Sequence, residues 1–182
     1  MAKDGGMSLK HSILAVLSSE PKTGYQLSKD VQGSTGFFWK ATHQQVYKEL
    51  ASLEGSGFVK HLEVAQKDKP DKKVYSVTKS GIKELIRWMR EPTELAVMRD
   101  AFLIKLFVGH LIEPKEILED LERQKQVVET RQEQFQNLEK EYFQNPSSLP
   151  IEHQFNYMTL RKGIILGKAW LSWCKEVEDF LK

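Results

Sequence analysis

The sequence predicts a mainly α-helical protein, in which a winged helix-turn-helix domain is followed by an all-helical dimerisation domain. Apolar residues recur with helical spacing over most of the 182 residues. The alternation typical of strands is concentrated in residues 58–77, where two short runs flank a charged tip. Because this segment follows three helical segments within residues 8–57, the order is that of a helix-turn-helix with one helix in front and a two-stranded wing behind.

Composition and charge are those of a globular protein with a basic first half. Hydrophobic residues make up 40% of the chain, which is enough for packed cores. Residues 1–91 carry 15 Lys and Arg against 10 Asp and Glu, a net charge of +5, whereas residues 92–182 carry 12 against 15, a net charge of −3. A basic half is compatible with a polyanionic partner, although many solvated surfaces are equally basic.

The sequence contains no pattern for export or for a membrane span. Cys174 is the only cysteine, so no intrachain disulfide forms, and no apolar stretch is long enough to cross a bilayer. We therefore expect a cytoplasmic protein with no membrane contact. Residues 1–7 lack periodicity and are predicted to be a flexible tail, followed by a winged-helix domain over residues 8–92 and a helical dimerisation domain over residues 93–182.

Two helices are predicted in front of the most informative segment. The first places four apolar residues at helical spacing before the turn at residues 18–21: Leu9, Ile13, Leu14 and Leu17. The second begins with a capping box, in which the Thr23 hydroxyl accepts from the first turn and the Gln26 side chain reaches back. It ends near Gly33, and an aromatic link follows.

Residues 42–55 are predicted to form the recognition helix. Thr42 and Gln45 make a second capping box at its start, and Gly55 and Gly57 supply the left-handed conformation that ends a helix. Three residues at i, i+4 and i+7 form one apolar stripe that must face a core: Val46, Leu50 and Leu53.

The opposite face of this helix carries small and hydrogen-bonding side chains where a surface helix usually carries paired charges. Such a face suits base edges and phosphates, so we predict that Gln44, Gln45, Lys48 and Ser52 approach the major groove of DNA, and that Tyr47 and Lys40 approach the phosphates. Thr42 and His43 complete the predicted contact set on this helix. An ordinary solvated helix surface is the alternative interpretation.

The wing is predicted from two runs of β-branched and aromatic residues, 58–64 and 73–77. Pro70 and the neighbouring Asp residues are expected to prevent regular strand over the tip, residues 65–72. Four lysines of the wing are predicted DNA contacts, although in isolation they would be ordinary solubilising residues: Lys67, Lys69, Lys72 and Lys73. Thr78 then caps a fourth helix that runs through Met89 and ends before Pro92.

The second half of the chain predicts helices that pack against one another. Residues 101–108 are almost wholly apolar and need cover on most sides, and Pro114 opens a long helix to about residue 143. Its heptad seam is coiled-coil-like, but Lys125 and Gln132 interrupt the second seam, which favours antiparallel packing against the last helix, residues 151–181. That helix is apolar on two faces, so one face is expected to meet a second chain in a homodimer. The predicted dimerisation residues are Leu121, Val128, Phe135, Leu160, Ile164 and Leu171.

The remaining chemistry-bearing residues do not predict an enzyme. The five histidines show no spacing suited to metal binding, and no nucleophile motif, Gly-rich phosphate loop or carboxylate site occurs, so neither a metal nor a cofactor is expected. Cys174 lies in an apolar stripe beside Trp173 and is interpreted as a buried structural thiol. Tryptophans at helical spacing are more often core than pocket. An effector site is nevertheless predicted at the junction of the two domains, near Trp39, Phe102 and Trp170.

From Met7 onward the sequence resembles the PadR family of bacterial transcriptional regulators. The resemblance lies in Gly24-Tyr25-Gln26-Leu27, Phe38-Trp39, Val46-Tyr47 with Leu50, Leu53, Glu54 and Gly57, and Val74-Tyr75-Ser76-Val77-Thr78 with Gly81. The segment from Met98-Arg99-Asp100 is similar to the longer-tailed branch of the family, which includes the virulence-gene activator of Vibrio. One departure is Lys48, which stands where many members have proline.

The resemblance implies a dimer held by the tail, a two-fold double-stranded DNA operator, repression in most members, and in some a small aromatic effector. Together with the elements described above, it predicts a homodimeric, sequence-specific transcriptional regulator, most simply a repressor, with its recognition helix in the major groove and its wing on the adjacent backbone or minor groove. The alternative is a winged-helix module that binds another protein and uses its tail as a scaffold.

Overall fold

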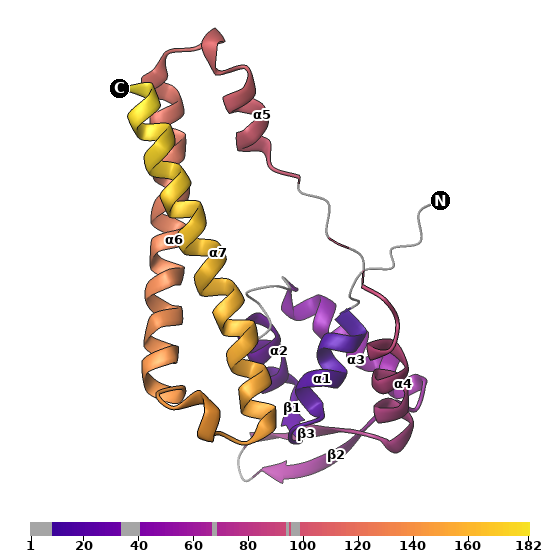
Figure 1. The fold of residues 1–182 in the computed structure, drawn as a ribbon. Helices are drawn as coiled ribbons and strands as arrows, with labels where there is room; N and C mark the ends of the chain where they lie inside the picture. Colours follow the sequence, from indigo (N-terminus) through magenta and orange to yellow (C-terminus); the bar gives the residue numbers. More distant parts are fainter. Residues whose placement is uncertain (1–8, 34–40, 67–68, 94, 96–98) are drawn as a thin grey trace. The chain divides into compact units, whose positions relative to one another are not determined.

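The computed structural model describes residues 9–33, 41–66, 69–93, 95 and 99–182. The chain forms two compact units, Met1–Ala96 and Val97–Lys182, and each has a hydrophobic core of its own. The first unit contains helices and a small sheet, and the described part of the second contains helices only (Figure 1). This is the mainly α-helical architecture that the sequence predicts.

The helices of the first unit are α1 (Leu9–Leu17), α2 (Gly24–Gly33), α3 (His43–Gly55) and α4 (Lys79–Met89). Each coincides with a predicted helix, because its start is encoded locally. Both sides of the Thr42–Gln45 capping box are formed at the start of α3, and the side chain of Thr78 accepts a hydrogen bond from Gly81 N at the start of α4. Gly57 takes a φ of 72° after α3, the left-handed conformation that glycine favours.

The core of this unit lies between the four helices and the inner face of the sheet. Its buried residues come from every helix and from two strands: Ile13, Leu14, Leu17, Leu27, Val31, Val46, Leu50, Leu53, Val59, Tyr75 and Leu85. The predicted apolar stripe of α3 is wholly in this core, since Val46, Leu50 and Leu53 are at most 2% exposed. The other faces of α3 are therefore free to meet solvent or a partner.

The sheet contains three strands in the order β1-β3-β2: β1 (Lys22–Thr23), β2 (Val59–Gln66) and β3 (Lys69–Val77), paired antiparallel. The prediction that Pro70 prevents strand over residues 65–72 is wrong, because β2 continues to Gln66 and β3 begins at Lys69. Proline is tolerated there since the register shifts between Val64 and Gln66, and since β1 reaches β3 only at Val74 and Tyr75. Strand β1 was not predicted, because two residues carry no periodicity.

The second unit contains α5 (Ala101–Phe107), a short 3-10 turn (Gly109–Leu111), α6 (Pro114–Tyr142), a second 3-10 turn (Pro146–Ser148) and α7 (Ile151–Leu181). Helices α6 and α7 lie side by side as a hairpin (Figure 1). The predicted lengths of the two long helices and their antiparallel packing are confirmed. Among the described helices, none has the length and apolar character that a membrane span requires.

The polar residues that interrupt the second seam of α6 connect it to α7. The ammonium of Lys125 donates to Glu178 at 2.8 Å, the amide of Gln132 donates to the carbonyl of Gly163 at 3.1 Å, and Arg161 donates to Glu139 at 3.1 Å. Positions 125, 132 and 139 are seven residues apart, so one stripe of α6 fixes the register of the hairpin by hydrogen bonds.

The predicted dimerisation residues differ in their burial within a single chain, and their role between chains stays a prediction. Leu121, Phe135 and Ile164 are at most 4% exposed within a single chain, where α6 packs on α7, and Val128, Leu160 and Leu171 are half-buried. The heptad seam therefore stabilises the hairpin of one chain. Apolar side chains that the single chain leaves exposed lie on other faces of the tail: Ile104 and Phe107 on α5, and Phe155, Met158, Ile165 and Leu166 on α7.

Candidate nucleic-acid interface

The solvent-facing side of α3 carries the polar residues that the sequence singled out. Thr42, His43, Gln44, Gln45, Tyr47, Lys48 and Ser52 are all exposed. Lys48 has no carboxylate partner within the described part of the chain, so its charge is available to an external anion. Lys40 and Trp39 fall outside the described residues.

Two of these side chains stabilise the start of the helix. The Oε1 atom of Gln45 accepts from Thr42 N at 2.8 Å and from the Thr42 hydroxyl at 3.2 Å, and that hydroxyl accepts from Gln45 N at 3.2 Å. Gln45 therefore has its NH₂ group, but not its carbonyl oxygen, left for another partner. The capping box fixes where the exposed face of α3 begins.

Helix α2 supports the N-terminal turn of α3 through three residues. The hydroxyl of Ser28, which is fully buried, lies 2.7 Å from His43 Nδ1. The ring of Tyr25 lies alongside the imidazole of His43, with centroids 6.3 Å apart and an interplanar angle of 15°. A Cβ at Gly24 would come within 2.6 Å of the Tyr47 ring, so glycine permits that ring to lie on α2. The sequence did not single out Ser28, and it marked Tyr25 only as part of the family motif, because these residues face α3 only after the helices pack.

The wing is held to the end of α3 and to α4. His61 Nδ1 on β2 forms a hydrogen bond with the carboxylate of Glu54, and its ring lies 5.6 Å from that of Tyr75, whose pKa is raised by burial. At the same end of the strands, the Thr78 hydroxyl donates to Gly57 O at 2.7 Å. The base of the wing is thus fixed to the recognition helix, so the two surfaces keep a constant relation.

Only some of the predicted wing lysines lie in the part of the chain that the structure describes. Lys72 and Lys73 are exposed, and Lys73 Nζ lies 4.0 Å from Glu63, a weak and solvated ion pair. Lys69 lies on β3, whereas Lys67 falls outside the described residues. The exposed ammonium groups of the wing lie beyond the fixed base, on the same unit as α3.

A second polar cluster joins α1 to α4, on residues that the interface does not use. Glu84 accepts from Arg87 at 2.8 Å and from Lys10 at 2.8 Å, and these cations hold the pKa of its carboxyl well below the usual range. His11 stacks on Trp88 with centroids 4.5 Å apart, and burial lowers the pKa of its imidazole. This cluster stabilises the helical core behind α3.

The predicted effector residues of the tail belong to its core. Phe102 is 4% exposed and makes an edge contact with Trp173 at 6.1 Å, and Trp170 is half-buried beside the same ring, at 6.2 Å. Cys174 is fully buried in this cluster, and burial raises the pKa of its thiol to about 11. The interpretation of Cys174 as a buried thiol is confirmed, and the effector cleft at the domain junction stays a prediction.

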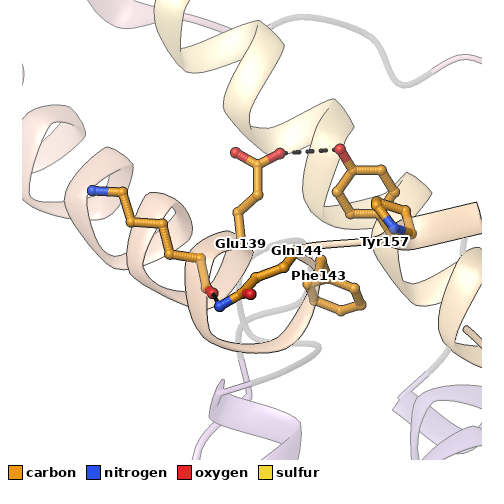
Figure 2. A pocket seen from close by; sticks show the side chains of 6 residues that line it. Glu139, Phe143, Gln144 and Tyr157 are labelled. Atoms are coloured by element: carbon orange, nitrogen blue, oxygen red, sulfur yellow. Dashed lines mark hydrogen bonds between the residues drawn. The ribbon is translucent and has the colours of Figure 1, made fainter. Parts of the chain in front are cut away.

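The tail also contains an open hollow of about 490 Å³ at the turn between α6 and α7 (Figure 2). The hydroxyl of Tyr157 donates to Glu139 at 3.1 Å, and Arg161 donates to the same oxygen, so the carboxylate of the hollow already has two donors. The aromatic rings that line it lie 5.3 Å apart. The lining residues are Glu139, Lys140, Phe143, Gln144, Pro146 and Tyr157.

Comparison with known proteins supports the resemblance seen in the sequence. Residues 13–87 match the Transcriptional regulator PadR-like family, and residues 98–182 match the family described as Virulence activator alpha C-term. A probable transcriptional regulator of Mycobacterium tuberculosis, Rv1176c, is 30% identical over 97% of this chain and 98% of its own length. The chain belongs to the PadR-like family of transcriptional regulators.

Solved PadR-like structures share the fold over nearly the whole chain. The Vibrio cholerae virulence activator AphA is 33% identical with a TM-score of 0.78, and the alignment covers 96% of this chain and 98% of AphA. Bacillus subtilis PadR in complex with operator DNA is 25% identical with a TM-score of 0.82, covering 96% and 99%. These PadR-like relatives favour a regulator over a winged-helix module that binds only other proteins.

Proposed function

We propose that this PadR-like regulator acts by binding a specific DNA operator and not by catalysis. The observation that carries the proposal is the exposed face of α3, which presents polar groups and Lys48, a lysine with no carboxylate partner among the described residues, while the apolar stripe of the helix is buried in the core. Bacillus subtilis PadR, a similar protein, has been crystallised with operator DNA. In this proposal α3 enters the major groove, and the wing, residues 58–77, lies on the adjacent backbone or minor groove.

The exposed residues divide into base contacts and phosphate contacts. Gln44, Lys48 and Ser52 lie along the outer side of α3 and approach base edges, and the NH₂ group of Gln45 is left for a further contact. The phenol of Tyr47 approaches a phosphate, as do the cations of the preceding link and the wing: Lys40, Lys67, Lys69, Lys72 and Lys73. The phosphate contacts set the register of α3, and the base contacts select the sequence.

We further propose that the winged-helix domain, residues 8–92, is paired with a second copy through the helical domain, residues 93–182. The exposed apolar residues of α5 and α7 support this, since Phe107 is 87% exposed and Phe155 is 69% exposed in one chain. A two-fold dimer reads a two-fold operator whose half-sites lie one helical turn, about 34 Å, or a multiple of it apart. Occupancy of a promoter by such a dimer represses transcription.

The DNA experiment begins with selection of genomic fragments by the full chain, followed by titration of the recovered duplex and a scrambled duplex of equal length. Gln44→Ala should weaken binding to the recovered duplex by about 1 to 3 kcal/mol and leave the scrambled duplex nearly unchanged. Lys72→Ala should weaken binding to both duplexes alike, and it should reduce the slope of log affinity against log salt concentration by about one. Lys115→Ala, an exposed lysine of α6, is the matched control.

The division into base and phosphate contacts is contradicted if Gln44→Ala and Lys72→Ala each lower the affinity for the recovered and the scrambled duplex equally. Binding that does not weaken as salt rises would instead point away from DNA as the partner.

The dimer is tested separately by sedimentation of the full chain. Ile165→Glu should produce monomers because it places a charge on an exposed apolar face of α7, whereas Leu62→Glu, on an exposed residue of the wing, should leave the dimer intact.

We also propose control by a small aromatic molecule. The structure of Bacillus subtilis PadR has been solved in complex with p-coumaric acid, and its alignment covers 95% of this chain. The predicted site, near Trp39, Phe102 and Trp170, includes a half-buried ring whose fluorescence would report the ligand. The probe is p-coumaric acid. If the ligand binds at this site, Trp170→Phe should abolish the change in fluorescence and the change in DNA affinity that the probe produces.

The hollow beside Phe143 and Tyr157 provides the comparison (Figure 2). Loss of the response in Phe143→Leu, with Trp170→Phe unaffected, would move the site to the end of the α6–α7 hairpin. Unchanged fluorescence and unchanged DNA affinity across a set of aromatic acids would remove the effector from the proposal.

A further inference from the structure

Ser28 is a buried polar residue with no part in the contacts proposed above. Its side chain is 0% exposed, in the middle of α2. A hydroxyl removed from water must donate its proton, because an unpaired buried donor is strongly unfavourable. Within the part of the chain that the structure describes, the hydrogen-bond partner of this hydroxyl is His43 Nδ1, at 2.7 Å. Either atom of this pair could donate, and only donation by Ser28 gives the proton of its hydroxyl a partner among the described residues.

This bond determines the state of the imidazole. When Nδ1 accepts, it carries no proton, so the proton of the neutral ring is on Nε2. Nε2 lies on the far side of the ring from Nδ1, and His43 is exposed, so the N–H donor faces away from the core. The ring of Tyr25 lies alongside, with centroids 6.3 Å apart and an interplanar angle of 15°. The imidazole thus presents one donor in one orientation.

We propose that Ser28 is a positioning residue, which holds His43 so that Nε2–H donates to a phosphate oxygen of the DNA backbone. His43 is the first residue of α3, beside the first-turn N–H groups, and this end of a recognition helix lies near the DNA backbone. The inference rests on the proposed function, because it requires that α3 is on DNA. A purine N7 in the major groove has the same acceptor chemistry, and the experiment separates the two acceptors.

The first measurement does not involve DNA. The ¹⁵N shifts of the histidine rings in the full chain report which nitrogen carries the proton, and His43→Gln assigns the signals. We expect the Nε2–H tautomer for His43 in the wild type, and a mixture of tautomers in Ser28→Ala. Ser12→Ala, which removes another buried hydroxyl of the same unit, should leave the His43 signals unchanged. An Nδ1–H tautomer in the wild type, or no change in Ser28→Ala, overturns the inference.

The second measurement uses the duplex recovered by genomic selection and its scrambled counterpart. His43→Ala and Ser28→Ala should each lower affinity for both duplexes, by about two- to tenfold. The double variant should bind no more weakly than His43→Ala, because Ser28 acts through His43. Additive losses overturn the coupling, and a loss confined to the recovered duplex overturns the phosphate assignment.

The two proposals fail in different ways. If the wild type binds neither duplex, the proposed function fails, whatever tautomer the ring adopts. If the wild type binds both duplexes and His43→Ala binds as well as the wild type, the proposed function stands and this inference fails. Because His43 is exposed, its variants should fold, and they measure the contribution of His43 to DNA affinity even if Ser28→Ala does not fold.

Discussion

Replacing Gly81 by alanine should loosen the attachment of the wing to α4. An added Cβ would lie 2.2 Å from the backbone oxygen of Phe58 and 2.7 Å from Cγ2 of Val77. A carbon and a carbonyl oxygen approach to about 3.3 Å at closest, so the helix and the strand must separate by about 1 Å. The oxygen cannot turn aside, because it accepts from Thr78 N at 2.9 Å, and the hydroxyl of the same residue donates to the neighbouring Gly57 O at 2.7 Å.

The magnitude follows from these contacts. Overpacking of a well-packed site costs about 1 to 3 kcal/mol, and weakening the two hydrogen bonds of Thr78 adds about 1 kcal/mol. Alanine in a helix returns about 0.5 to 1 kcal/mol. The net loss in the free energy of unfolding is therefore about 1 to 3.5 kcal/mol, a large share of the 5 to 15 kcal/mol typical of a domain.

Gly55→Ala is the matched control, since it is the same substitution in the same unit. A Cβ at Gly55, the last residue of α3, would meet nothing within 4 Å. We therefore expect this variant to gain about 0.4 to 1 kcal/mol, mainly from the reduced entropy of the unfolded chain.

The assay is urea unfolding of the full chain, combined with hydrogen exchange of peptides from β2 and α4, because the two units need not unfold together. Faster exchange in these peptides should accompany Gly81→Ala, and tail peptides should be unaffected. The reasoning is refuted if Gly81→Ala unfolds within about 0.5 kcal/mol of the wild type, or if both alanine variants shift stability in the same direction.

Three further predictions concern buried polar and thiol groups. Burial lowers the pKa of His11 below 6.5, so its contribution to stability is present above pH 6.5 and is lost as the pH falls through the lower, folded value. His11→Phe, which keeps the stack on Trp88, should flatten the pH dependence of unfolding there; an unchanged slope would contradict this. Gln132→Met should raise stability by up to about 1 kcal/mol in urea unfolding, because relief of a buried Oε1 with no partner among the described residues outweighs loss of the bond to Gly163 O; a lower midpoint would count against it. Cys174, with a thiol pKa of about 11, should react with iodoacetamide at pH 8 only after unfolding, and rapid labelling of the native chain would show that the thiol is accessible.

Local sequence signals were sufficient to predict the limits of several helices. The capping boxes at Thr23 and Thr42, the cap at Thr78 and the left-handed glycine at position 57 are all made by residues within a few positions of one another. Such contacts form in whatever tertiary setting the segment meets, so the limits of these helices could be predicted. The same holds for the exposed face of α3, because the apolar stripe alone decides which side of a helix is buried.

Features that depend on partners far apart in the chain could be recognised only in the folded protein. Strand β1 exists because β3 offers it an edge, and Pro70 remains in a strand because the register shifts beside it and only one neighbour is present. The heptad seam of α6 reads equally well as a contact with another chain, and only its packing against Gly163 and the rest of α7 assigns it to one chain. The hydrogen bond from Ser28 to His43 joins residues fifteen positions apart on two helices. No local pattern encodes such a contact, since it depends on the angle at which α2 and α3 pack.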